Sequence, residues 1–190
     1  CDYKMEEYLD SLTADGIYHL PFFEIENFLL SEELLQIMIE TYCLEENKVA
    51  VINSVKKKIC DLFVEQKDSW VAKHVAFDLR DKFDYRGKIK SLKGIEELKA
   101  LYNAERKSND DIDEMARKYI TLHSEFVAGN DYSVILRHLD AKGIITQCRS
   151  LFKFGKTVHY EQQVFTLLNS DKGDSFLSKI RYQYLSGIEA

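Results

Sequence analysis

Two carboxylates and an amide lie inside an apolar run near the start of this chain, Phe22-Phe23-Glu24-Ile25-Glu26-Asn27-Phe28-Leu29-Leu30. A buried carboxylate is costly unless it is paired or bound to a metal. In a strand, Glu24 and Glu26 would share one face, because residues two apart point the same way. Two neighbouring carboxylates repel each other unless a cation lies between them, and their oxygens suit a hard divalent cation. The run therefore predicts a magnesium site.

Other charged clusters stand before and after this run. Asp2 follows Cys1 at the start of the chain, and Asp140-Ala141-Lys142-Gly143 interrupts an apolar stretch much later. The tripeptide 155–157, Gly-Lys-Thr, resembles the end of a phosphate-binding loop but lacks the leading glycine at the required spacing. We treat Lys156 as a candidate phosphate contact, although an exposed lysine with no ligand is the commoner case.

Length and composition predict one globular domain. The chain has 190 residues, of which 45% are hydrophobic and 12% aromatic, enough to form a core. No apolar run is long enough to span a membrane, and the four cysteines form no Cys-x-x-Cys pair. We expect a cytoplasmic protein with reduced thiols. Because the chain begins at Cys1, we also expect it to be part of a longer protein.

The net charge of −6 conceals an uneven distribution. The first 47 residues hold 12 acidic residues and one lysine, a balance of −11, whereas the other 143 residues carry +5. An acidic N-terminal part could collect metal, and a mildly basic remainder could approach phosphates. The simpler interpretation is an uneven surface charge with no partner.

Patterning predicts α/β ends around a helical middle. Turn residues precede a short strand over 17–20, and Ser31 is placed as the N-cap of a helix. A long amphipathic helix is expected over 49–63, with a pattern that could extend to residue 77. Another is expected from 110 to about 127, ended near Gly129. The run 132–139 is too short to distinguish a strand from a buried helix. Further helices are predicted over 160–168 and 174–185. We therefore predict an α/β core from 1–44 and 130–190, with a helical insertion over 45–129.

The order of acid, acid pair and lysine resembles the Toprim fold of topoisomerases, primases and overcoming-lysogenization-defect nucleases. The resemblance is closest to Toprim-like domains that accompany ABC-type ATPases in bacterial anti-phage defence. Their phrase Glu-Ile-Glu-Asn-Tyr-Leu-Leu is similar to residues 24–30, and their Ile-Asp-Gly-Lys is similar to 139–142, with Ala141 in place of glycine. The resemblance implies a small parallel sheet with flanking helices. The earlier acidic residues of this family would precede Cys1.

The resemblance also implies roles for single residues. Asp2, Glu24 and Glu26 would bind Mg²⁺ or Mn²⁺, and two such ions stabilise the attacking and leaving oxygens of a phosphodiester displacement. Lys142 would contact the phosphate as negative charge develops, with a helix that Asp140 caps behind it. Taken singly, Asp2 could be only a frayed end, Glu24 or Glu26 a first-turn acid, Asn27 a turn cap and Lys142 a solvated lysine.

Three functions remain open from the sequence. The first is a metal-dependent nuclease that cleaves DNA or a structured, tRNA-like RNA and works with an ABC-type ATPase, fused or separate. The second is a non-catalytic Toprim-like module that docks to the ATPase or forms a homo-oligomer. The third is a helical protein-interaction domain without a Toprim core, which the lack of a parallel sheet beside Glu26 and Lys142 would favour.

Overall fold

The computed structural model describes residues 25–79, 92–105, 112–155, 159–171, 174–175 and 178–179. Of these residues 77% are helical, and their β pairing is an isolated antiparallel bridge between Cys43 and Phe154. The helices follow in the order α2 (Ile25–Leu29), α3 (Glu32–Tyr42), α4 (Lys48–Glu65), α5 (Lys67–Asp78), α6 (Ile95–Glu105), α7 (Ile112–Gly129), α8 (Tyr132–His138), α9 (Ile144–Cys148) and α10 (Tyr160–Leu168).

The predicted α/β fold with a small parallel sheet is wrong, because the described residues form helices and no sheet. The ambiguous run 132–139 is helical, since Asp131 accepts hydrogen bonds from Ser133 N at 2.9 Å and Val134 N at 3.4 Å. Its buried residues recur at helical spacing, as Tyr132, Ile135, Leu136 and Leu139. The predicted strand 17–20 lies outside the described residues.

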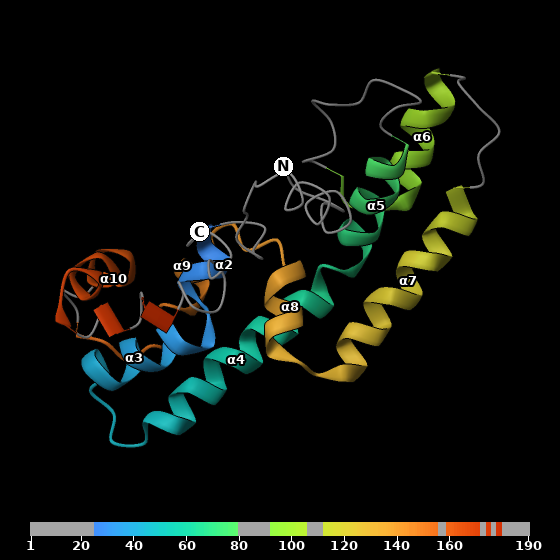
Figure 1. Cartoon of the computed structure of the whole chain (residues 1–190). Helices are drawn as coiled ribbons and strands as arrows, with labels where there is room; N and C mark the ends of the chain where they lie inside the picture. Colours follow the sequence, from blue (N-terminus) through green and yellow to red (C-terminus); the bar gives the residue numbers. More distant parts are fainter. Residues whose placement is uncertain are drawn as a thin grey trace, which may run out of the picture.

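Helix α4 runs through the middle of the molecule and joins two groups of helices (Figure 1). On one side α3 and α9 pack against it, and α10 packs against α3. On the other side α5 contacts both α6 and α7, while α8 lies between the groups and contacts α4 and α7. No helix in the described part of the chain is both long and apolar enough to cross a membrane.

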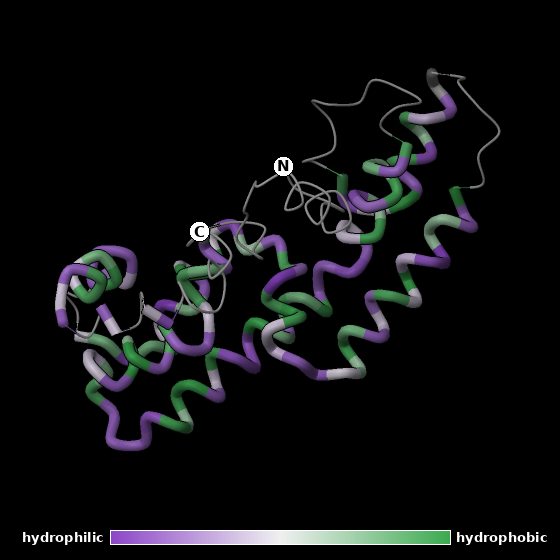
Figure 2. The backbone as a smooth tube through the Cα atoms, in the orientation of Figure 1, coloured by the Kyte–Doolittle hydropathy of each residue, from purple (hydrophilic) through white to green (hydrophobic). Residues whose placement is uncertain are grey.

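The N-cap and the apolar pattern of the sequence explain where α4 begins and which of its faces is buried. Asn47 Oδ1 accepts a hydrogen bond from Ala50 N at 3.0 Å at the start of the helix. Its buried residues lie on one face, so apolar and polar residues alternate along the helix in Figure 2. The expected continuous helix to residue 77 is instead two helices, because the chain turns at Gln66 between α4 and α5.

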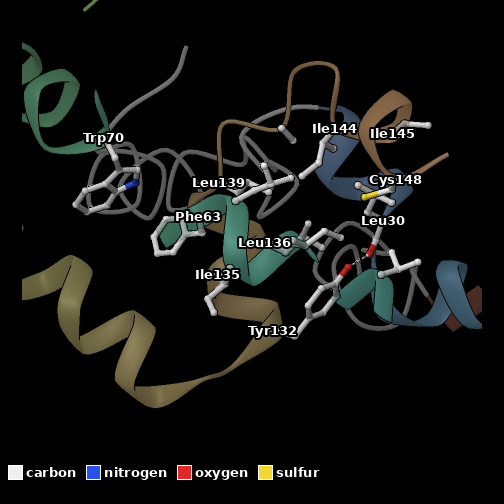
Figure 3. Close-up of a cluster of buried hydrophobic side chains, with 14 of the residues drawn as sticks. Leu30, Phe63, Trp70, Tyr132, Ile135, Leu136, Leu139, Ile144, Ile145 and Cys148 are labelled. Atoms are coloured by element: carbon white, nitrogen blue, oxygen red, sulfur yellow. Dashed lines mark hydrogen bonds between the residues drawn. The ribbon is translucent and has the colours of Figure 1, made fainter. Parts of the chain in front are cut away.

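The core is continuous across both groups of helices. Figure 3 shows Leu30, Leu136, Ile144 and Cys148 gathered between α2, α8 and α9. Burial raises the pKa of the Cys148 thiol to about 11, which keeps it protonated and unreactive at neutral pH.

Three imidazoles pack among aromatic rings where α4, α5, α7 and α8 meet. The ring of His123 stacks on Phe63 with centroids 4.4 Å apart, and that of His138 stacks on Phe126 at the same 4.4 Å. The ring of His74 lies 3.8 Å from that of Trp70. Burial, aided by the charge of Arg137, lowers the pKa of His138 to about 4, so that this ring is neutral in the folded protein at pH 7.

We predict that the protein loses stability as the pH falls from about 6.5 to 4. Over this range the unfolded chain binds a proton at residue 138, while the folded His138, with its pKa of about 4, does not. The unfolding free energy should fall by up to about 3 kcal/mol from this group, with no further loss below its folded pKa. Burial lowers the pKa of His123 in the same direction.

Urea titrations at several pH values measure this effect. His138→Gln should flatten, without abolishing, the pH dependence of the unfolding free energy. A His138→Gln variant with the original slope would show that residue 138 does not cause it.

Candidate functional site

The predicted metal ligands are only partly within the described structure. Glu26 is half-buried in the first turn of α2, a position that a helix dipole favours for an acid. Asp2, Glu24 and Lys156 lie outside the described residues. Because Glu26 is helical, the expected strand with two carboxylates on one face is wrong at this position. The described residues contain no cluster of three His, Cys, Asp or Glu side chains that could hold a metal ion.

Asn27 connects the two phrases that the sequence singled out. Its side chain is fully buried, and Nδ2 donates to the carbonyl oxygens of Leu136 and, at 3.0 Å, of Leu139. Only the amide nitrogen can donate to two carbonyls, so the orientation of the side chain is fixed. Asn27 therefore meets Leu136 and Leu139 across more than a hundred positions of sequence. The predicted role of Asn27 as a local turn cap is wrong.

Two tyrosine hydroxyls donate hydrogen bonds to backbone carbonyls at the end of α2. Tyr132 Oη donates to Leu30 O at 2.7 Å, a bond drawn in Figure 3, and Tyr160 Oη donates to Leu29 O at 2.7 Å. Burial is the main reason that the pKa of each phenol lies well above its usual value, so both hydroxyls remain donors. The last carbonyls of α2 are thus satisfied by α8 and α10.

Asp140 has a different role from the predicted helix cap. Its Oδ2 lies 2.6 Å from Nζ of Lys73 on α5, and the Lys73 side chain is only 7% exposed. Gln66 binds the backbone of the same residue twice, as Nε2 donates to Asp140 O at 2.8 Å and Asp140 N donates to Oε1 at 3.1 Å. The N-cap of α9 is Gly143, with φ of +77° and no side-chain cap bond.

Lys142 remains available for a ligand. It lies in the turn between Asp140 and α9, its side chain is exposed, and no carboxylate of the described residues forms an ion pair with it. Asn27 holds this turn next to α2 by its bond to Leu139 O. The arrangement therefore places a free ammonium group on a turn anchored beside the helix that carries Glu26. Such a pair can act on a phosphate only if a metal accompanies the carboxylate.

Sequence reasoning missed a second group of residues, around the start of α10. Arg149, Phe152, Phe154, His159, Tyr160 and Glu161 line a cavity of about 470 Å³. The spacing of the aromatic residues over 152–160 was the available signal, but it does not distinguish a ring that lines a cavity from one in the core.

The chain has no match among known proteins at the level of a family model, a curated protein or a solved structure. The resemblance to Toprim-like domains therefore depends on residues 24–30 and 139–142 alone.

We predict that Asn27→Asp destabilises the protein more than Asn27→Leu does. Both changes remove the donor to Leu136 O and Leu139 O, which costs about 1–3 kcal/mol for each buried carbonyl left without a partner. Aspartate also places a buried negative charge against those two oxygens. Chemical denaturation of the three proteins at pH 7 measures the order, and equal losses for Asp and Leu would contradict the assigned contacts.

The Lys73–Asp140 ion pair should show an asymmetric response to mutation. Asp140→Ala leaves an ammonium group in the interior and should cost about 2–4 kcal/mol of unfolding free energy. Lys73→Met should cost less, because the Asp140 side chain is 34% exposed and can recover contact with water. Thermal and urea unfolding measure both values, and the reverse order would show that Lys73 is not the buried partner.

Proposed function

We propose that this chain forms part of a metal-dependent nuclease that hydrolyses phosphodiester bonds in DNA or structured RNA. The observation that supports this proposal is the Asn27 bridge, which joins the helix that carries Glu26 to Leu139, three residues before Lys142, across 112 positions of sequence. The architecture around this pair is helical.

Each residue has a role in this proposal. Glu26 supplies a carboxylate oxygen to Mg²⁺ or Mn²⁺, jointly with Asp2 and Glu24, and Lys142 neutralises the phosphate. The bound metal would supply the activated water and stabilise the leaving oxygen. The buried amide of Asn27 fixes the position of the helix that carries Glu26 relative to the turn that carries Lys142. Mutation of Asn27 should therefore reduce cleavage through position rather than through loss of a ligand.

The proposed setting follows the family resemblance. The protein would act in the bacterial cytoplasm as an anti-phage effector, together with an ABC-type ATPase that is either fused to it or separate. Nucleic acid is the proposed substrate.

A second candidate function is a helical interaction module without catalysis. It is favoured by the helical scaffold, the lack of a metal-ligand cluster among the described residues, and apolar side chains exposed between α3 and α4. Leu44 is 76% exposed and Val49 67% exposed in this region. Under this alternative the protein would bind the ATPase, or a second copy of itself, and would leave nucleic acid intact.

Cleavage assays of the natural full-length protein distinguish the two functions. We expect Mg²⁺ or Mn²⁺ to support cleavage of DNA or tRNA, and Glu26→Gln and Lys142→Ala each to reduce the rate by about 100-fold or more. Glu40→Ala and Lys118→Ala, exposed residues on α3 and α7, are the matched controls and should cleave at the normal rate.

Circular dichroism of every variant verifies that its folding is intact. Cleavage that is unchanged in both Glu26→Gln and Lys142→Ala would refute the nuclease. If no nucleic acid is cleaved and the Leu44→Ser variant no longer binds the ATPase, the interaction module is the correct function.

A further inference from the structure

A cavity of about 470 Å³ opens between α9 and the start of α10. Pockets for small molecules in proteins typically measure roughly 300–1,000 Å³, so this space is large enough for one nucleotide. Its lining combines aromatic rings with charged side chains, and the two kinds of group come from adjacent segments of the chain.

Three stacked aromatic rings form one wall of the cavity. The rings of Phe152 and Tyr160 are 4.5 Å apart at an angle of 25°, and those of Phe154 and Tyr160 are 6.2 Å apart at only 4°. Phe152 and Tyr160 are buried, whereas Phe154, whose ring also meets the Tyr42 ring at a centroid distance of 6.0 Å, is half-buried and is the most accessible of the three. Parallel, partly exposed rings are surfaces on which nucleobases stack, at about 1–3 kcal/mol per base.

The rim of the cavity carries both signs of charge. Arg149 is exposed at the end of α9, and it forms no ion pair with a carboxylate of the described residues. Its planar guanidinium matches two oxygens of a phosphate. Glu161 is exposed in the first turn of α10, and its negative charge would repel a phosphate placed beside it. Its carboxylate can instead accept hydrogen bonds from the amino groups of a base.

This combination selects among ligand classes. Inorganic phosphate would use Arg149 but leave the aromatic wall exposed to water, and an apolar molecule would leave Arg149 and Glu161 without partners. A nucleotide uses all three parts, since it has a flat base, amino or imino donors and a phosphate.

The cavity is also connected to the proposed catalytic helix. Tyr160, one of the wall rings, donates its hydroxyl hydrogen to Leu29 O in α2, three residues after Glu26. This bond ties the wall to the helix that carries Glu26. A strand whose nucleotide occupies the cavity would therefore lie on the same group of helices as Glu26.

We infer that the cavity binds one nucleotide unit, with its base on Phe154 and its phosphate on Arg149. The inference rests on the proposed function for the choice of a nucleic-acid strand as the source of that nucleotide. A free nucleotide has the same chemistry, and the experiment separates these two sources.

Binding is measured in EDTA, so that cleavage does not contribute. Fluorescence anisotropy follows a labelled single-stranded DNA or RNA decamer, and calorimetry follows AMP and GMP. Arg149→Ala should weaken binding about 10-fold or more and lower the salt-dependence slope by about one. Phe154→Leu keeps the apolar volume but removes the ring face, and should weaken binding about 5-fold or more. Lys118→Ala on α7 is the matched control and should bind normally.

The outcomes are distinct. If Arg149→Ala and Phe154→Leu both weaken binding of the decamer, the ligand is a nucleic-acid strand. If the two variants weaken binding of AMP or GMP to the same degree, the ligand is a free nucleotide. Binding that neither variant weakens, or no binding of any probe, would overturn the pocket.

Glu26→Gln separates this inference from the proposed function. It should bind the decamer normally, because residue 26 does not line the cavity. If Glu26→Gln cleaves normally while Arg149→Ala binds weakly, the nuclease proposal fails and the pocket stands. If Glu26→Gln abolishes cleavage while both pocket variants bind normally, the pocket fails.

Discussion

The structure depends on how the last carbonyl groups of its helices find donors. A helix leaves four such carbonyls without internal partners, and in a buried helix end each needs a donor from elsewhere. Here the donors come from distant side chains. The hydroxyls of Tyr132 and Tyr160 bind the end of α2, while Asn27 and Trp70 bind the end of α8. Helices of five and seven residues are too short to be stable alone, so these contacts are a condition of their existence.

Helix α8 is consequently the link between the two groups of helices. Asn27 reaches its final carbonyls from α2, and Trp70 Nε1 donates to His138 O at 3.0 Å from α5. Gln66, between α4 and α5, binds the backbone of Asp140, two residues after His138. The turn that carries Lys142 therefore has its position set from both sides. This explains how a surface lysine can have a defined place although its own side chain has no ion-pair partner among the described residues.

Local patterns predicted much of the helical structure but not its long-range contacts. Helix α10 has the predicted bounds, and α7 ends at Gly129 as its composition indicated. The predicted parallel sheet followed the family resemblance, which rests on two short phrases. The apolar run 132–139 alone fits a strand or a helix, and its helical state depends on the preceding cap at Asp131. The partners of Asn27 could not be inferred, since nothing in a single sequence indicates which carbonyls a buried amide will meet. The same holds for Asp140 and Lys73, which lie 67 positions apart.

The bond from Tyr160 to Leu29 spans 131 positions, and this has a consequence for synthesis on the ribosome. At roughly 5–20 residues per second, α2 emerges about 7–26 s before its last partner. During that interval the carbonyls of Leu29 and Leu30 lack their donors on α10 and α8. The acidic residues of this region, Glu32, Glu33 and Glu40 among them, would help to keep the incomplete chain from associating with others.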